Sequence, residues 1–173
     1  MKYLLIVLPF LAACGSGVYK SDEPPTRPYG EFGRVEIREL TVQISNLETL
    51  SPELQTEIAA AARTFPGLLE ARLNKKHLFE KGSKRTLVIQ GSLLSYDPGS
   101  RTTRWLLGFG AGTGYLTTSL RFTDDAGAQA GAGKAIGTVS GGFTGGSMDS
   151  AANRMADAIV RYLQENGKEV VKP

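Results

Sequence analysis

Residue types that can act as catalysts or metal ligands are present in this 173-residue chain, but their spacing does not assemble a site. His77 is the only histidine, and it stands among lysines without the second histidine or the cysteine that a zinc site needs. Asp124 and Asp125 are adjacent, so on an extended chain they point to opposite sides and read as a turn instead of an acid–base pair. No Gly-x-Ser-x-Gly nucleophile motif occurs. We therefore expect that the protein is not an enzyme and that it has no catalytic residues, no metal and no cofactor.

Cys14 is the only cysteine, and it directly follows a segment with the layout of a secretory leader. Lys2 supplies a positive charge, and residues 3–13 form an apolar run too short to cross a bilayer, which needs about 20 residues. Residues 11–15, Leu-Ala-Ala-Cys-Gly, resemble the lipobox of bacterial lipoproteins. The resemblance implies that a diacylglyceryl group is attached to the Cys14 sulfur, that residues 1–13 are removed as a signal peptide, and that the new amino group is acylated, as with palmitate.

Lipidated Cys14 would hold the mature chain on a membrane, because two or three acyl chains on one residue make retention effectively permanent. By analogy with the sorting of enterobacterial lipoproteins, the absence of aspartate at position 15 points to the outer membrane, with the domain facing the periplasm. The alternative is a plain secretory leader with a chance cysteine.

The glycine-rich residues 108–114 could form a phosphate-binding loop, but the pattern does not fit a nucleotide site. The third glycine of a Gly-x-Gly-x-x-Gly fingerprint would fall on Thr113. Gly133 and Lys134 lack the upstream glycine and the following Ser or Thr of a phosphate loop. We therefore expect no nucleotide. Closely spaced glycines also let two backbones approach or let a strand bend, so a curved segment packed inside the domain is the plainer interpretation.

The residues that lead into this glycine stretch could form a contact surface. Four large apolar side chains stand within five positions, from Trp105 to Phe109, and two arginines precede them. Successive side chains of a strand point to opposite faces, so these residues cannot all be buried on one side. Trp and Arg are frequent interface anchors. We expect exposure and partner contact in residues 101–114, and burial on both sides is the alternative. The candidate contact residues are Arg101, Arg104, Trp105, Leu107 and Phe109.

Composition excludes several classes of protein. The net charge is +3, or +2 without Lys2 (3 − 1), which is too weak a basic excess to indicate nucleic acid binding. One cysteine, already lipidated, cannot form a disulfide inside the domain. After residues 1–13 no segment is apolar for 18 residues, so we expect no transmembrane helix.

The periodicity of apolar residues predicts strands and helices. Ser51-Pro52-Glu53 is typical of a helix start, and Pro66-Gly67 predicts a kink or two helical pieces. Strands that are neighbours in sequence and joined by short turns predict antiparallel pairing. We expect an α+β fold with two layers: an antiparallel sheet of about four strands and helices packed on one face, in the order β-α-β-β-β-α. The predicted strands are 34–44, 85–96, 114–123 and 128–139, and the predicted helices are 51–79 and 147–163.

These elements give a single domain with two flanks. Residues 14–33 contain three prolines and show no apolar periodicity, so we expect a flexible tether next to the lipid. Residues 34–166 form the periplasmic domain, and residues 167–173 form a C-terminal tail.

Several motifs follow one another in the second half of the chain. They are Tyr96, the turn Pro98-Gly99-Ser100-Arg101, Arg104, glycine-rich residues 108–112, amphipathic residues 116–122, and a glycine-rich passage into a closing helix over residues 140–163. On these features the segment from Ile89 to Leu163 resembles the bacterial lipoprotein family of the domain of unknown function 4410. The resemblance implies the envelope location and the fold, but no reaction.

The sequence thus predicts a non-enzymatic lipoprotein of the outer membrane that binds an envelope protein or itself, as a protein-interaction or envelope-assembly module. One alternative is a carrier of a small apolar or lipid ligand, which would need an apolar cavity between sheet and helices. A second is a cell-wall hydrolase, which would need convergent titratable groups in a pocket.

Overall fold

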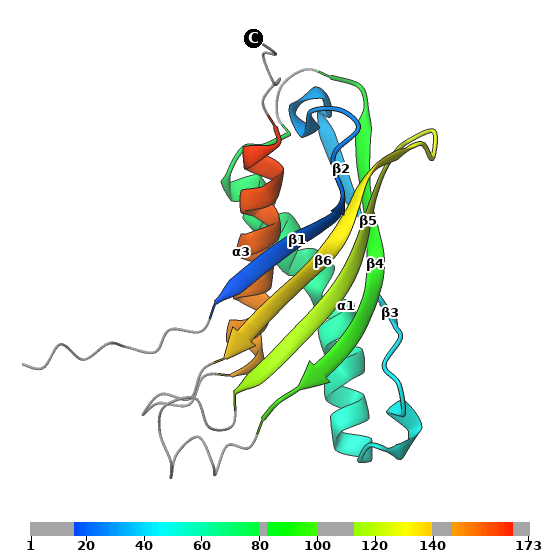
Figure 1. Ribbon diagram of the computed structural model, residues 1–173, viewed down its shortest axis with the longest axis vertical. Coiled ribbons are helices and arrows are strands. Elements are labelled where there is room, and N and C mark those ends of the chain that lie inside the picture. The colour runs from blue at the N-terminus through cyan, green and yellow to red at the C-terminus, as the bar shows by residue number, and fades with distance from the viewer. Residues whose placement is uncertain (1–15, 80–82, 100–112, 140–146, 168–173) are drawn as a thin grey trace, which may run out of the picture.

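A six-stranded sheet forms the centre of the computed structural model, which describes residues 16–79, 83–99, 113–139 and 147–167. The strand order is β1-β6-β5-β4-β2, and β3 also pairs with β4 (Figure 1). The strands are β1 (Gly17–Glu23), β2 (Arg34–Ile37), β3 (Thr41–Val42), β4 (Thr86–Asp97), β5 (Gly114–Asp124) and β6 (Gln129–Val139). The helices are α1 (Pro52–Lys75) and α3 (Met148–Glu165), with short 3-10 turns at Tyr29–Glu31 and Leu47–Thr49.

The α+β class is confirmed, but the sheet has more strands than the predicted four and is not purely antiparallel. β4, β5, β6 and β1 pair antiparallel, whereas β2 and β3 run parallel to β4. The reason is the connection: α1 lies between β3 and β4 and carries the chain back to the start of the sheet, and a return of this length gives parallel strands.

The predicted tether, residues 14–33, was wrong for residues 16–33, because these residues belong to the domain. β1 pairs with β6, and the Tyr19 ring stacks on Tyr162 with 4.1 Å between ring centroids. Tyr29 and Phe32 are each only 1% exposed. Their burial offsets the entropy of ordering a proline-containing segment, and three aromatic side chains were too sparse to show as a periodic pattern.

Helix α1 begins where the sequence predicts. The Ser51 side chain accepts a hydrogen bond from the Leu54 backbone N–H (3.3 Å), and Pro52 is the first helical residue. The backbone N–H of Glu53 and the Ser51 hydroxyl lower the pKa of the Glu53 carboxyl. One helix continues through Pro66, so the two separate helical pieces that were one form of the prediction do not occur. The buried stripe on both sides of the proline compensates for the lost hydrogen bond. It consists of Ile58, Ala62, Phe65, Leu69 and Leu73.

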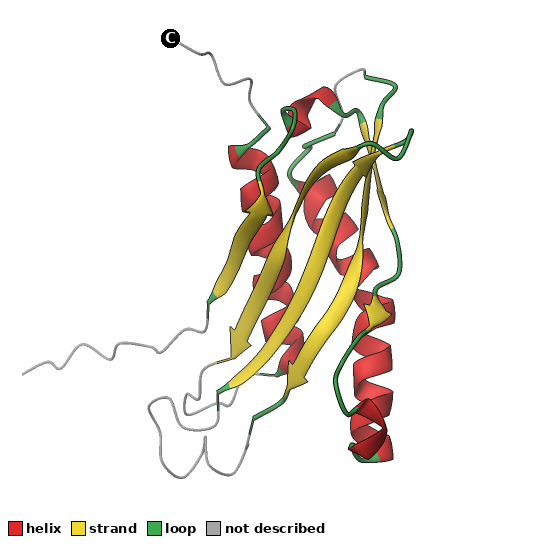
Figure 2. Cartoon of the chain, turned by 45° about the vertical axis from the view of Figure 1, so that its right-hand side comes forward, coloured by secondary structure: helices red, strands yellow, loops and turns green. Residues whose placement is uncertain are grey.

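Both helices cover the same face of the sheet, as the position of their apolar stripes predicts (Figure 2). α3 packs on β6, β1 and β5, while α1 packs on β2, β3 and α3. Arg72 on α1 links the helices, because its guanidinium donates to Asp157 (2.5 Å) and to Asn153 on α3. The other face of the sheet carries neither helix in the described part of the chain.

A cluster of aromatic rings closes the covered face at β1. Tyr19, Tyr29, Phe122 and Tyr162 lie with ring centroids 4.1 to 6.3 Å apart. The hydroxyls of Tyr19 and Tyr29 are buried without a hydrogen bond of ordinary geometry to a described residue. Burial raises the pKa of both phenols, and the neighbouring Tyr162 adds to the effect.

We expect these two tyrosines to make the protein sensitive to alkali. Below about pH 10 they are protonated in both states and contribute no pH dependence. Above about pH 10 the unfolded chain releases protons that the folded chain keeps, so stability falls by up to about 1.4 kcal/mol per pH unit for each buried tyrosine. Urea unfolding at increasing alkaline pH measures this slope. Tyr29→Phe should make the slope shallower, because it removes one of the two buried phenols. An unchanged slope in Tyr29→Phe would contradict the expectation.

Candidate functional site

The predicted site residues lie outside the described residues. This holds for the lipid attachment residue Cys14 and for the contact residues Arg101, Arg104, Trp105, Leu107 and Phe109. The site must therefore be sought on the surfaces that the described residues form.

The uncovered face of the sheet, opposite the helices, is here called the open face. Strand alternation sets its character: along β5, Leu116, Thr118 and Leu120 are buried toward the helices, while the residues between them face outward. The outward residues are mainly polar. The open face includes Val18, Lys20, Asp22, Gln90, Ser92, Tyr115, Thr117, Ser119, Arg121, Lys134, Ile136 and Thr138.

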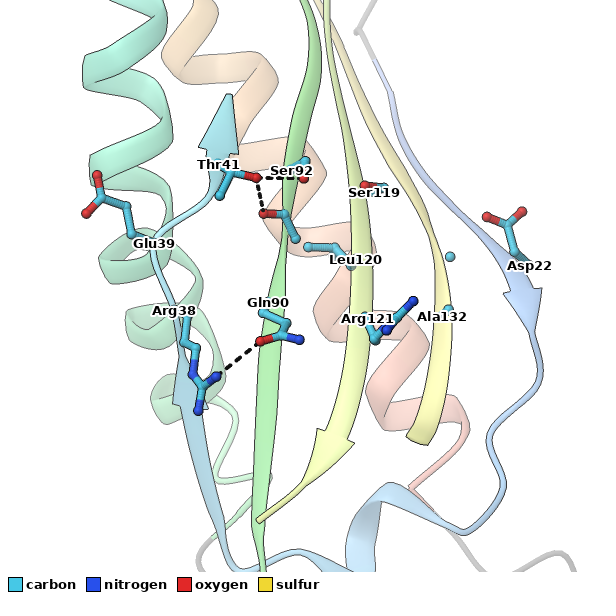
Figure 3. A pocket seen from close by; sticks show the side chains of 12 residues that line it. Asp22, Arg38, Glu39, Thr41, Gln90, Ser92, Ser119, Leu120, Arg121 and Ala132 are labelled. Carbon is cyan, nitrogen blue, oxygen red and sulfur yellow. Dashed lines mark hydrogen bonds between the residues drawn. The ribbon is translucent and has the colours of Figure 1, made fainter. Parts of the chain in front are cut away.

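A polar depression of about 550 Å³ lies in the middle of the open face and is here called the hollow (Figure 3). One wall is fixed by hydrogen bonds. Arg38 donates to Gln90 (3.2 Å) and forms an ion pair with Glu36 (2.9 Å), and the Thr41 and Ser92 hydroxyls are 2.7 Å apart. The hollow is lined by Asp22, Arg38, Glu39, Thr41, Gln90, Gly91, Ser92, Ser119, Leu120, Arg121, Ala132 and Gly133.

The other wall of the hollow carries charges that are not paired. Arg121 on β5 and Asp22 on β1 line the same depression, and neither forms an ion pair with another described residue. Glu39, beside the fixed wall, has none either. The hollow therefore offers both signs of charge together with hydroxyl and amide groups. Such a surface can form directional polar contacts with a partner.

Two lysines lie directly opposite each other next to the hollow. Lys20 on β1 is in register with Lys134 on β6, and Lys134 is in register with Ser119 on β5. Both lysines are exposed, and neither forms an ion pair with a described residue. Like charges in directly opposite positions destabilise a sheet, so this pair favours an anionic group nearby.

Three large apolar side chains are exposed at the end of the open face where β1 and β5 begin and β6 ends. Val18 is 53% exposed, Tyr115 is 41% exposed and Ile136 is 36% exposed. Val18 is in register with Ile136, and Tyr115 is in register with Thr138, which follows Ile136 by two residues. We call these three residues the apolar end.

The covered face holds a cleft of about 550 Å³ between α1, α3 and the ends of β4 and β5. Phe65, Leu68, Leu116 and Met148 contribute apolar walls, and the Tyr96 hydroxyl donates to Glu57 (3.2 Å) within it. Among the described residues, no group of three His, Cys, Asp or Glu side chains lies close enough to hold a metal ion. No helix in the described ranges is both long and apolar enough to cross a bilayer.

Strand alternation alone could have revealed the open face. Along residues 115–121, polar or exposed positions alternate with buried ones, so the outward set could be picked out from the same pattern that identifies the core. The hollow could not be found in this way, because it combines β1, which was not predicted, with β3 and β4, whose parallel pairing was not predicted.

The family model described as domain of unknown function (DUF4410) matches residues 35–146. The match confirms the resemblance for residues 89–146 and extends N-terminally to β2, but it does not include the closing helix up to Leu163. None of the curated proteins matches the chain.

Two solved structures of PelC dodecamers from Paraburkholderia phytofirmans are similar in fold. One, a single-substitution variant, is 14% identical with a TM-score of 0.52, covering 86% of this chain and 97% of the PelC chain. The other is 12% identical with a TM-score of 0.51, covering 90% of this chain and 99% of the PelC chain. Likeness at this identity shows the fold alone.

Proposed function

Since the chain belongs to the family of the domain of unknown function DUF4410, whose name assigns no activity, we propose a function from the surfaces of the molecule. We propose a non-enzymatic lipoprotein, anchored in the outer membrane through lipidated Cys14 and facing the periplasm. Its domain is an envelope-assembly module that associates with copies of itself through the open face of the sheet.

The hollow carries this proposal. A solvated face is ordinary for an antiparallel sheet, so exposure alone indicates nothing. A depression lined by an arginine, Arg121, and two carboxylates, Asp22 and Glu39, none of which forms an ion pair with another described residue, is less ordinary. Because both signs are present, the hollow is suited to a protein surface with charges of both signs, such as a second copy, better than to a polyanion.

Self-association is also supported by the fold comparison. The similar PelC chains are described as dodecamers. In a closed ring, one patch of each copy contacts a different patch of the next copy. The two ends of the open face differ from each other, so this face can supply two such patches. This support is an analogy of fold.

The lipid anchor is supported by the leader-like residues 1–13 and by the lipobox-like sequence around Cys14. Ser16, two residues after Cys14, is hydrogen-bonded to Thr138 at the end of the sheet, so the proposed anchor would lie next to the folded domain.

Native mass spectrometry of the full chain, processed in bacteria and extracted in mild detergent, tests both parts of the proposal. We expect acyl mass on Cys14 and a multimer. Arg121→Glu should weaken association at least tenfold, about 1.4 kcal/mol, because a buried carboxylate would replace a guanidinium in the contact. The matched control is Arg63→Glu on the exposed side of α1, which should leave association unchanged. A monomer at every concentration, or equal loss in both variants, would refute assembly through the hollow. Missing acyl mass would refute the anchor.

The alternative function, a carrier of an apolar or lipid ligand, is favoured by the cleft between α1 and α3. Its walls also include Glu57, Thr64 and Asn153, which makes it less suited to a wholly apolar ligand. Stoichiometric binding of a fatty acid by the full chain, lost in Leu68→Arg, would favour the carrier over the assembly module.

A further inference from the structure

We propose that the apolar end of the open face docks on an anionic phospholipid surface. Val18, Ile136 and Tyr115 would lie in the headgroup region, and Lys20 and Lys134 would lie against lipid phosphates. This inference rests on the proposed lipid anchor at Cys14, and it concerns a different part of the open face from the hollow.

Only a short stretch of chain separates the proposed anchor at Cys14 from the fixed part of the domain. The Ser16 backbone N–H donates to the Thr138 hydroxyl (2.9 Å), and the Ser16 carbonyl accepts from the Thr138 N–H (2.8 Å). Only Gly15 lies between Ser16 and Cys14. Two residues span at most about 7 Å even when extended, so the lipids would leave the domain beside Thr138. The domain is therefore held against the bilayer.

The apolar end lies next to the residue from which the proposed anchor leaves the domain. Tyr115 is in register with Thr138, the residue that fixes Ser16. Val18 follows Ser16 by two residues and is in register with Ile136. Isolated exposed apolar side chains are common on proteins, but all three that are exposed in the described part gather around the anchor. Tyrosine and aliphatic side chains are typical of residues at the boundary between headgroups and acyl chains.

Apolar and positively charged side chains follow each other in a fixed order along β1 and β6. Lys20 and Lys134 stand two residues beyond Val18 and Ile136, about 7 Å further along the strands from the anchor at 3.4 Å per residue. Apolar groups nearest the lipid and cations next to them match the order of acyl chains and phosphates in a bilayer. Asp97, which is in register with Tyr115, is a carboxylate beside the apolar end, and it accepts a hydrogen bond from the Gly99 backbone N–H (2.7 Å).

A lipid surface fits the apolar end better than a second copy does. Three side chains supply far less area than the roughly 800 Å² per partner of a stable protein interface. Next to a lipid anchor a small patch suffices, because the anchor already supplies retention and the patch has only to orient the domain.

Vesicles made of neutral phosphatidylcholine, with and without phosphatidylglycerol, test the proposal. The full-length, processed Ile136→Cys variant is reconstituted and labelled at position 136 with a polarity-sensitive fluorophore. We expect a blue shift and protection from iodide quenching that increase with phosphatidylglycerol. The control is Lys84→Cys, an exposed position just before β4, at the opposite end of that strand from Asp97. It should remain fully quenchable.

Replacing Lys20 and Lys134 with alanine should lower the docked-to-undocked ratio about 30-fold, since each basic residue near an anionic leaflet contributes roughly fivefold.

The outcomes separate this proposal from the one that it rests on. Acyl mass on Cys14 together with equal quenching at positions 136 and 84 would overturn docking and leave the anchor intact. A blue shift of the same size in neutral vesicles would show that anionic lipid is not recognised and would overturn the proposal. Absence of acyl mass would overturn the anchor, and docking with it.

Discussion

Gly137→Ala is expected to lower the free energy of unfolding by about 3 kcal/mol, although it adds a single methyl group. An ideal Cβ at Gly137 would lie 1.9 Å from the Ala151 carbonyl oxygen, 2.7 Å from the carbonyl carbon and 3.0 Å from the Met155 Cβ. Two of these atoms are backbone, so no rotamer change can relieve the overlap, and α3 must move away from β6. For a domain of this size the melting temperature should fall by about 6–12 °C, measured by circular dichroism.

Gly67→Ala is the matched control, because it makes the same chemical change where nothing lies within 4 Å of the new Cβ. Gly67 is inside α1, where alanine is favoured over glycine by up to about 1 kcal/mol. The control should therefore be neutral or stabilising. If both variants melted at the same temperature, the close seating of α3 on β6 would be contradicted.

Phe122→Ala is expected to cost about 3–5 kcal/mol, the usual range for a large aromatic side chain deleted from a core. Phe122 is 0% exposed, and its ring contacts Tyr19 (6.1 Å between centroids), Tyr29 (5.5 Å) and Tyr162 (6.3 Å). These rings come from β1, the turn Tyr29–Glu31 and α3, so the cavity would open where three separate segments meet. Urea unfolding measures the loss.

Tyr115→Ala serves as the control for Phe122→Ala, since Tyr115 lies on the same strand but on the open face. Its removal should change the free energy of unfolding by less than about 1 kcal/mol, as expected for an exposed position. Limited proteolysis adds a local readout, because loss of the ring cluster should expose β1 to cleavage before the rest of the domain. A loss below about 1 kcal/mol in Phe122→Ala would contradict the role assigned to the cluster.

Elements with strong local signals were predicted from the sequence. The start of α1 follows from Ser51-Pro52-Glu53, where each residue type satisfies a need of a helix N-terminus. The β5–β6 hairpin follows from its turn: the Asp124 carboxylate accepts from the Ala126 and Ala128 N–H groups, and Gly127 has φ +83°. Both depend on residues close together in the chain.

Features that depend on distant residues were not predicted. β1 is held by β6 and by Tyr162, more than a hundred residues away, so nothing in its own sequence distinguishes it from a tether. Gly131, Gly133 and Gly137 weaken β6 as a strand by propensity, yet additional side-chain atoms at Gly133 and Gly137 would meet Tyr19 and α3. The hollow was missed for the same reason, since its walls come from β1, β4 and the β2–β3 segment.

The pairing of the first strand with the last has a consequence for the order of folding. The hydrogen bond between Ser16 and Thr138 closes a loop of 122 residues, which is slow because the entropy of closure must be lost before the contact is gained. Until β6 has formed and has joined β5, the residues of β1 have no strand to pair with. Under the lipid anchor proposed above, an enzyme that modifies Cys14 would act during this interval, before the completed sheet closes over the residues that follow the cysteine.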